Sequence, residues 1–255
     1  MSPEPIPAIE ATDLACAYQD RRVLEGVSFS VRSAEIFFII GGTGVGKTTL
    51  LKNLVGLATP VAGEVRFNGT SFTNADTAAR REMLRTFGLS FQGGALWSSL
   101  TLSQNIALPL EEYTRLPADE IARIAAFRLS QVGLSGFEEY YPSEISGGMR
   151  KRAGLARALA LDPGIVFFDE PSAGLDPVTA RNLDRLIVEI RDTFGTTIVI
   201  VSHDVDSIVG IADRLIMLDS DTRGIIAEGT PAVLAAGPAG TKVVEFLTRR
   251  TIRPR

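Results

Sequence analysis

The stretch Ile36-Phe-Phe-Ile-Ile-Gly-Gly-Thr-Gly-Val-Gly-Lys-Thr-Thr49 decides the fold of this chain. Residues 36–40 form a continuous apolar run, which is typical of a strand buried on both faces of a parallel sheet. The glycines that follow end the strand, and Lys47–Leu57 has the apolar spacing of a helix. The order of strand, glycine-rich loop and helix predicts an α/β core with a mostly parallel sheet.

The glycine-rich loop fits the phosphate-binding pattern G-x-x-x-x-G-K-[ST]. It comprises Gly41, Gly42, Thr43, Gly44, Val45, Gly46, Lys47 and Thr48, followed by Thr49. Glycines let successive backbone N–H groups turn inward around an anion, and the next helix adds its positive N-terminal end. Lys47 is expected to neutralise the β- and γ-phosphates, and the Thr48 hydroxyl to ligate Mg²⁺. A turn that merely connects two elements is the alternative, but the Lys-Thr pair in this context favours binding of Mg²⁺ and ATP.

Two further apolar strands end in polar side chains. Ile165–Phe168 runs into Asp169 and Glu170, and His203, the only histidine of the chain, follows the strand Thr197–Val201. Asp169 is expected to hold Mg²⁺, and Glu170 can reach an attacking water. If the phosphate-binding loop were absent, Asp169 and Glu170 would be interpreted as ordinary solvated acids at a strand end. A lone histidine is more often structural, but ligands bind at the carboxyl ends of parallel strands, which favours His203 near the γ-phosphate.

Two glycine-containing segments add further candidates. Gln92 precedes Gly93-Gly94, and its neutral amide can contact Mg²⁺ or water; a plain surface glutamine is the alternative. Ser146-Gly-Gly-Met149 precedes a helical run, where serine is a strong N-cap and the glycines expose backbone N–H groups. A second anion site and an ordinary capped helix are equally good interpretations of these four residues taken alone.

Strands and helices alternate along most of the chain. Strands are expected at Ala8–Ala17 and Val27–Val31, and residues 103–161 are mostly helical in pattern, with breaks at Pro109, Pro117, Gly133 and Pro142. We predict one domain over residues 8–230, with a core of residues 8–90 and 162–230, an inserted helical subdomain of residues 91–161, and a C-terminal helical tail of residues 231–255.

Composition narrows the function classes. The chain has 255 residues, 45% of them hydrophobic, and a net charge of −4, which argues against nucleic acid as the main partner. Its one cysteine, Cys16, allows no internal disulfide. Neither a signal-peptide pattern nor an apolar run of roughly 18–20 residues is present, so any membrane role is expected to act through a partner.

Together, these motifs resemble the nucleotide-binding subunit of ATP-binding-cassette (ABC) transporters. The resemblance covers residues 8–230 and rests on a fixed order of motifs, namely the phosphate loop, Gln92, Ile145–Met149, Asp169-Glu170, Ser172–Asp176 and His203. It implies a P-loop NTPase core with a mostly parallel sheet, an N-terminal antiparallel β part and an inserted helical subdomain. It also implies hydrolysis of ATP.

The resemblance assigns roles to individual residues. Tyr18 matches the aromatic that stacks on adenine, and Gln92 the residue that senses Mg²⁺ and couples to the membrane subunit. Glu170 resembles the general base and His203 the switch histidine. Ser146, Gly147 and Gly148 resemble the signature that binds the γ-phosphate of the partner subunit's ATP, and Asp176 the aspartate that links the two sites. The active form is then a homodimer closed on ATP.

A narrower resemblance is to the ATP-binding subunits of Mla-type and other mammalian-cell-entry (MCE) systems, which traffic lipids between bacterial membranes. It rests on Phe91–Trp97, Leu100–Leu110, Pro142–Arg152, Phe168–Pro177 and Thr241–Leu247. Met149 in place of the common Gln supports this branch, whereas Ile145 replaces the commoner Leu and Gly42 stands where Pro is frequent. Leu96 and Trp97 are candidates for the groove that receives the permease, although Trp97 fits a subdomain core equally well.

The branch implies an inner-membrane location on the cytoplasmic face, peripheral through an integral-membrane permease subunit. It further implies an MCE-domain protein and a small cytoplasmic regulatory subunit as partners, and phospholipid as cargo. Three alternatives remain: a transporter for an amino acid or another small molecule, a non-transport ABC ATPase, and a degenerate regulatory cassette. The last is disfavoured because Lys47, Asp169, Glu170 and His203 are all present.

Overall fold

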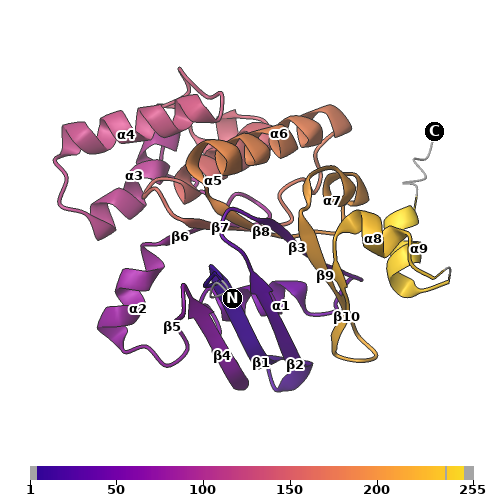
Figure 1. Ribbon diagram of the computed structural model, residues 1–255. Coiled ribbons are helices and arrows are strands. Elements are labelled where there is room, and N and C mark those ends of the chain that lie inside the picture. Colours follow the sequence, from indigo (N-terminus) through magenta and orange to yellow (C-terminus); the bar gives the residue numbers. More distant parts are fainter. Residues whose placement is uncertain (1–4, 239, 250–255) are drawn as a thin grey trace. The chain divides into compact units, whose positions relative to one another are not determined.

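The computed structural model describes residues 5–238 and 240–249 of the chain, drawn in Figure 1. The chain divides into two compact units. The first unit runs up to Arg80 and resumes at Thr197, and the second comprises Arg81–Thr196. Helix α2 (Thr77–Leu84) crosses the first of these divisions.

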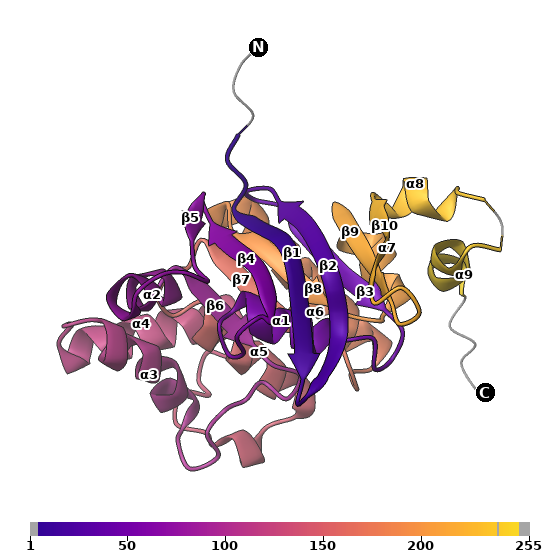
Figure 2. The ribbon, with the colours of Figure 1, turned by 90° about the horizontal axis from the view of Figure 1, so that it is seen from below.

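An antiparallel sheet forms the N-terminal half of the first unit. Its strands follow the order β2-β1-β4-β5, with bounds Arg21–Val31, Ile9–Tyr18, Ala62–Phe67 and Thr70–Ser71. Figure 2 shows β1, β2 and β4 side by side. β1 and β2 are joined by a tight turn that pairs Tyr18 with Arg21, and Gln19 in this turn has a φ of 53°. The predicted N-terminal antiparallel part is therefore confirmed.

The second sheet of this unit carries the glycine-rich loop. Strand β3 lies between two parallel neighbours, β8 and β9, and β10 pairs antiparallel with β9. The bounds are Ile36–Gly41 for β3, Thr197–Val201 for β8, Arg214–Asp219 for β9 and Gly224–Gly229 for β10. All residues of β3 and β8 are buried, as expected for strands covered on both faces. Helix α1 (Lys47–Leu54) follows the loop.

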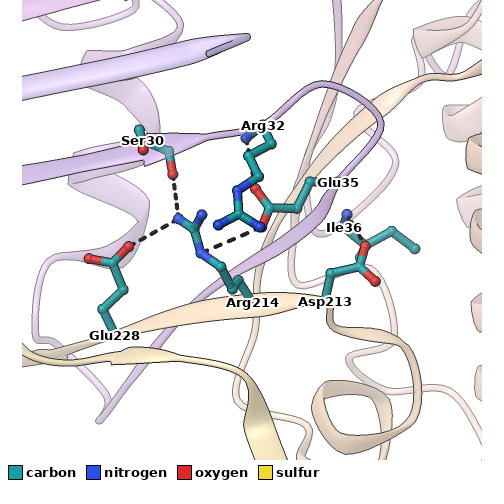
Figure 3. A network of polar contacts seen from close by, with 7 residues as sticks. All are labelled: Ser30, Arg32, Glu35, Ile36, Asp213, Arg214 and Glu228. Carbon is teal, nitrogen blue, oxygen red and sulfur yellow. Dashed lines mark hydrogen bonds and ion pairs between the residues drawn. The ribbon is translucent and has the colours of Figure 1, made fainter. Parts of the chain in front are cut away.

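A polar network fixes the beginning of β3 (Figure 3). Arg214 Nη2 donates to the Ser30 carbonyl at 2.7 Å and to Glu228 at 3.0 Å, and its Nε lies 3.5 Å from Glu35. The neighbouring Asp213 accepts a hydrogen bond from the Ile36 N–H at 2.8 Å. One arginine therefore connects β2, β9, β10 and the residue that precedes β3.

Three short helices complete the first unit, namely α7 (Val205–Ile211), which precedes β9, and α8 (Pro231–Ala235) and α9 (Lys242–Thr248), which follow β10. Phe246 and Leu247 of α9 are buried, and Lys242 Nζ donates to Asp219 at 2.6 Å and to Asp221 at 2.7 Å. Residues 239 and 250–255 of the predicted tail lie outside the described residues.

The second unit combines two parallel strands with a helical layer. Strand β6 (Phe87–Ser90) pairs with β7 (Ile165–Asp169). The helices are α3 (Leu102–Tyr113), α4 (Ala118–Gln131), α5 (Gly147–Ala158) and α6 (Pro177–Phe194), with a short 3₁₀ turn at Pro142–Glu144. Helix α5 runs directly against β6, since a Cβ on Gly88 would lie 2.0 Å from the Ala158 carbonyl oxygen.

Two predictions about where helices end or break were wrong. The helix after the loop ends at Leu54 rather than Leu57, because Gly56 adopts φ 75° and the Leu57 N–H turns back to the Lys52 carbonyl at 2.8 Å. Pro109 does not break its helix but lies inside α3, whose start is secured by a capping box at Thr101 and Gln104. Tertiary packing of Ile106 and Leu110 outweighs the local effect of the proline.

The α/β class and the mostly parallel core are confirmed by these sheets. The domain limits of residues 8–230, with an insertion at residues 91–161, stay a prediction, since the two compact units divide at residues 80 and 196 instead. Among the residues that the structure describes, no helix combines the length and apolar character needed to cross a membrane.

Candidate functional site

The loop between β3 and α1 has a backbone that only glycine adopts easily. Gly41, Gly44 and Gly46 have φ values of 148°, 78° and 105°. At Gly41 a side chain is excluded by space as well, because a Cβ there would lie 2.6 Å from the Leu218 carbonyl oxygen. Gly46 caps α1 in the left-handed conformation. The sequence pattern therefore corresponds to a real conformational requirement.

Lys47 closes the loop on itself. Its Nζ donates to the carbonyl oxygens of Gly41 and Gly42, each at 2.9 Å. Gly42, Thr43 and Gly44 are exposed, and a Cβ built on either glycine meets no atom within 4 Å. The loop thus brings its backbone N–H groups, the Lys47 ammonium and the exposed residue Thr48 together at the start of a helix. This donor set fits a phosphate chain with a bound Mg²⁺.

His203 lies at the same edge of the sheet as the loop. β3 and β8 pair in parallel with Ile39 opposite Val201, and the Ser202 N–H donates to the Ile39 carbonyl at 3.3 Å. His203 is thus two residues beyond Val201, just as Gly41 is two residues beyond Ile39. His203 is exposed. Tyr18, also in this unit, ends β1 with 60% of its surface exposed, as an aromatic that stacks on a ligand requires.

In the second unit, the two carboxylates at the end of β7 have different surroundings. Asp169 is the last residue of the strand and is buried, with 6% exposure. Glu170 follows with a φ of 52°, a conformation that non-glycine residues rarely adopt. A turn follows, in which the Ala173 N–H donates to the Glu170 carbonyl at 3.3 Å. Asp169 is therefore buried at the strand end, whereas Glu170 begins the turn that follows.

Ser146, Gly147 and Gly148 form the exposed start of α5. The Ser146 hydroxyl accepts from the Met149 N–H at 3.2 Å, so the residue is an N-cap, as predicted. Gly147 is exposed, whereas Gly148 is in tight contact with α6. A Cβ on Gly148 would lie 2.8 Å from Thr179 Cγ2. An exposed helix start of this kind can receive an anion from outside the chain.

Asp176 caps α6 next to this contact. Its Oδ1 accepts from the N–H groups of Val178 at 3.0 Å and Thr179 at 3.1 Å, and its Oδ2 accepts from the Thr179 hydroxyl. The Thr179 hydroxyl, followed by the Thr179 backbone N–H, lowers the pKa of Asp176 below its ordinary value. The carboxylate is therefore a charged group held in a defined orientation at the surface.

Gln92 and Trp97 lie in a loop after β6 that two other residues hold in place. Asn105 is fully buried, accepts from the Trp97 N–H at 2.7 Å and donates to the carbonyls of Trp97 and Leu100, each at 3.1 Å. Arg157 of α5 donates to the Ala95 carbonyl at 2.7 Å. Gln92 is exposed, and Trp97 is 63% exposed, so the interpretation of Trp97 as core is wrong.

The predicted site residues therefore fall into two groups. The first unit holds Tyr18, the loop Gly41–Thr49 and His203, of which the loop and His203 share one sheet edge. The second unit holds Gln92, Ser146–Gly148, Asp169, Glu170 and Asp176, of which Gly148 and Asp176 meet through Thr179. The roles of all these residues stay predictions.

Sequence reasoning missed residues that support the site rather than form it. These are Asn105, Lys151, Arg157 and Thr179. Asn105 could have been identified from the sequence, because it is a polar residue at a position where the helical spacing predicts a buried, apolar one. Lys151 and Arg157 of α5 carry no such signal, because their partners are backbone carbonyls of segments distant in the sequence.

The sequence of the chain is similar to those of known ATP-binding proteins, as the geometry of the loop suggests. The sequence pattern of the ABC transporter family matches residues 24–173. The chain is 38% identical over 239 residues to the intermembrane phospholipid transport system ATP-binding protein MlaF of Haemophilus influenzae, which covers 94% of this chain and 89% of that protein. It is 39% identical over 247 residues to the probable ribonucleotide transport ATP-binding protein mkl of Mycobacterium leprae, covering 97% and 70%.

Solved structures give the same result. The cbiO1 protein of Clostridium perfringens, part of the ABC transporter complex cbiONQ, superposes with a TM-score of 0.81 at 27% identity and covers 90% of this chain and 91% of that one. The cassette MJ0796, in a dimeric post-hydrolysis state bound to ADP and Pi, superposes with a TM-score of 0.78 at 27% identity, covering 87% and 98%. The chain therefore belongs to the ABC transporter family and is one of its ATP-hydrolysing cassette subunits.

Proposed function

We propose that this chain is the ATP-hydrolysing motor of a bacterial inner-membrane transporter that moves phospholipids between the inner and outer membranes with an MCE-type system. The observation that carries the ATPase part is the conformation of the loop Gly41–Thr48, with its left-handed glycines and the Lys47 ammonium held on two loop carbonyls. The identity with two MlaF proteins, 38% and 37% over 94% of this chain, supports the lipid part.

This proposal assigns a role to each residue of the nucleotide site. The N–H groups of Gly41–Thr49 and the Lys47 ammonium bind the phosphates, and Tyr18 stacks on the adenine. Thr48, Gln92 and Asp169 hold Mg²⁺, which supplies positive charge to the β- and γ-phosphate oxygens. Glu170 accepts a proton from the attacking water, and His203 orients the reacting phosphate. The buried position of Asp169 and the exposed position of His203 are consistent with these tasks.

A second copy of the chain completes the site. Ser146, Gly147 and Gly148 of one copy bind the γ-phosphate held by the other, and Asp176 lies at the contact between the copies. The exposure of Ser146 and Gly147 and the dimeric state of the MJ0796 cassette support this arrangement. ATP then favours the closed dimer because only that state uses both sets of donors, and hydrolysis reopens it.

The proposed membrane partner is a permease subunit, which holds the chain at the cytoplasmic face of the inner membrane. An MCE-domain protein and a small cytoplasmic regulatory subunit complete the assembly. The exposed Trp97 borders a groove of about 290 Å³, lined also by Leu108, Pro109 and Tyr113, which is a suitable docking place for a permease helix. Cassette limits of residues 8–230 and an inserted helical subdomain of residues 91–161 belong to the same proposal.

Two substitutions test the motor. Glu170→Gln is expected to keep ATP binding, to reduce hydrolysis about 10²-fold or more because the base is lost, and to accumulate a dimer with ATP in size-exclusion chromatography. The matched control is Glu189→Gln, which alters an exposed carboxylate on α6 and is expected to leave turnover unchanged. Full turnover in Glu170→Gln would remove Glu170 as the base.

Ser146→Arg tests the contribution of the second copy. It is expected to abolish hydrolysis and ATP-driven dimerisation while the monomer still binds ATP, because the phosphate loop of the same copy is untouched. If the monomer lost its ATP affinity, Ser146 would belong to the site of its own copy. Equilibrium binding of a fluorescent ATP analogue separates these outcomes.

Ribonucleotide is the second candidate cargo, because the name of the Mycobacterium leprae relative includes it. The neighbouring genes distinguish the two. A permease gene beside an MCE-domain gene supports lipid, whereas a gene for a small-molecule-binding protein in that place would contradict it.

A further inference from the structure

Lys151 contacts the backbone next to the proposed base. It lies on α5, one turn beyond the Ser146-Gly-Gly segment that begins this helix. Its Nζ donates to the Glu170 carbonyl at 3.4 Å and to the Ala173 carbonyl at closer range. An ammonium group has three donors, so one side chain can hold both carbonyls at once.

The turn that Lys151 holds has a strained first residue. Glu170 has a φ of 52°, a conformation that is unfavourable for a residue other than glycine and persists only where the surroundings enforce it. Inside the turn, the Ala173 N–H donates to the Glu170 carbonyl at 3.3 Å. That bond and the Lys151 ammonium together hold the peptide group that follows Glu170, which constrains the backbone from which the Glu170 side chain extends.

The surroundings of Lys151 favour a directed contact over a solvated one. The side chain is half-buried, and burial lowers the pKa of its ammonium while the charge of Glu170 opposes that effect. A partly desolvated ammonium gains more from two carbonyl oxygens than one in bulk water does. Removal of the ammonium would therefore cost the turn two hydrogen bonds to α5.

A second contact joins the same helix to the other end of this segment. Gly148 leaves room for Thr179 Cγ2, which a Cβ would approach to 2.8 Å. The Thr179 hydroxyl in turn donates to Asp176. The first two turns of α5 therefore touch the segment Glu170–Thr179 near both of its ends. A displacement of the Ser146–Gly148 segment would therefore be transmitted to the backbone at Glu170 through these contacts.

We propose that Lys151 is a positioning residue that makes the direction of the Glu170 carboxylate depend on the placement of the Ser146–Gly148 segment. This inference rests on the proposed function, in which Ser146–Gly148 bind the partner copy's ATP and Glu170 serves the ATP of its own copy. Lys151 then connects the two ATP sites of the dimer, so that binding at one site prepares the base of the other.

Three variants of the full chain test Lys151. Lys151→Met removes the ammonium and keeps the length of the stem, Lys151→Arg keeps a charged group with several donors, and Lys52→Met makes the same change on the last turn of α1. For Lys151→Met we expect kcat to fall about tenfold or more, because a misoriented Glu170 carboxylate accepts the proton of the attacking water less efficiently. The Kd for ATP should stay within about twofold of that of the unaltered chain. The Hill coefficient for ATP should fall towards unity.

Lys151→Arg is expected to recover most of the lost kcat and of the cooperativity, and Lys52→Met to match the unaltered chain. Thermal unfolding of every variant separates a folding defect from a positioning defect. The inference is overturned if Lys151→Met keeps both kcat and the Hill coefficient, or if Lys151→Arg is as slow as Lys151→Met at equal stability. A failure of the proposed arrangement of two shared sites is distinguishable, since the unaltered chain itself would then hydrolyse ATP with a Hill coefficient of one.

Discussion

Arg214→Met is the change whose consequence the structure determines best. The guanidinium is 13% exposed and the Glu35 carboxylate 5% exposed, so the substitution leaves a buried acid without its cation. It also removes the donors to the Ser30 carbonyl and to Glu228. Breaking a buried pair at one partner costs about 3–5 kcal/mol. We expect the lower limit, about 3 kcal/mol, because Glu35 still accepts from the Arg32 N–H at 2.7 Å.

Methionine isolates the electrostatic part of this loss. It retains an apolar stem beside the Phe37 ring, over which the guanidinium lies at 5.3 Å, and sulfur packs well against aromatic rings. The loss of packing should therefore be small. The double variant Arg214→Met with Glu35→Gln should recover at least about 1 kcal/mol, because the uncompensated charge is gone.

Urea unfolding followed by circular dichroism measures the free energy of unfolding of each variant. Arg223→Met is the matched control in the same unit, because Arg223 pairs with Glu25 at 3.1 Å with both side chains about half exposed, and it should cost less than about 1 kcal/mol. The reasoning is refuted if Arg214→Met costs no more than Arg223→Met. It is equally refuted if the double variant is no more stable than Arg214→Met.

Three further predictions follow from other contacts. Tyr18→Ala should weaken ATP binding by about 1 kcal/mol in an equilibrium titration, since an aromatic contact is worth that much, and an unchanged affinity would place adenine elsewhere. Gly88→Ala should cost about 3 kcal/mol in urea unfolding because its Cβ would lie 2.0 Å from the Ala158 carbonyl, whereas Gly164→Ala, with open space around it, should be neutral. The hydrogen bond from Lys242 lowers the pKa of Asp219, so its stabilising contribution is present above the ordinary pKa of that group and is lost as the pH falls through the lowered value. Stability should consequently fall more steeply from about pH 5 to about pH 2 in the unaltered chain than in Lys242→Gln, and parallel curves would contradict this.

The structure explains why the strongest sequence signals were reliable. The loop Gly41–Thr48 is local, and each of its requirements, a left-handed backbone, a lysine and a helix start, is met by residues within a few positions. The buried strands β3 and β8 were equally visible, because strands covered on both faces are apolar throughout. The N-cap at Ser146 is predictable for the same reason, because its hydroxyl bonds a backbone N–H three residues away.

Other features depend on segments that meet only in the folded chain. Arg214 donates to the Ser30 carbonyl, 184 positions away, and Lys151 to a carbonyl 22 positions away. Backbone carbonyls are present at every residue, so no side-chain pattern identifies such partners. The exposure of Trp97 and the helical position of Pro109 were likewise set by tertiary contacts.

The sequence by itself determined that a phosphate-binding loop joins a buried strand to a helix, because these properties reside in the types and spacing of neighbouring residues. Only the tertiary structure decided how α5 supports the turn at Glu170 and how one arginine secures the start of β3. Those contacts arise from the packing of distant segments, where distance and burial, rather than residue type, decide which atoms interact.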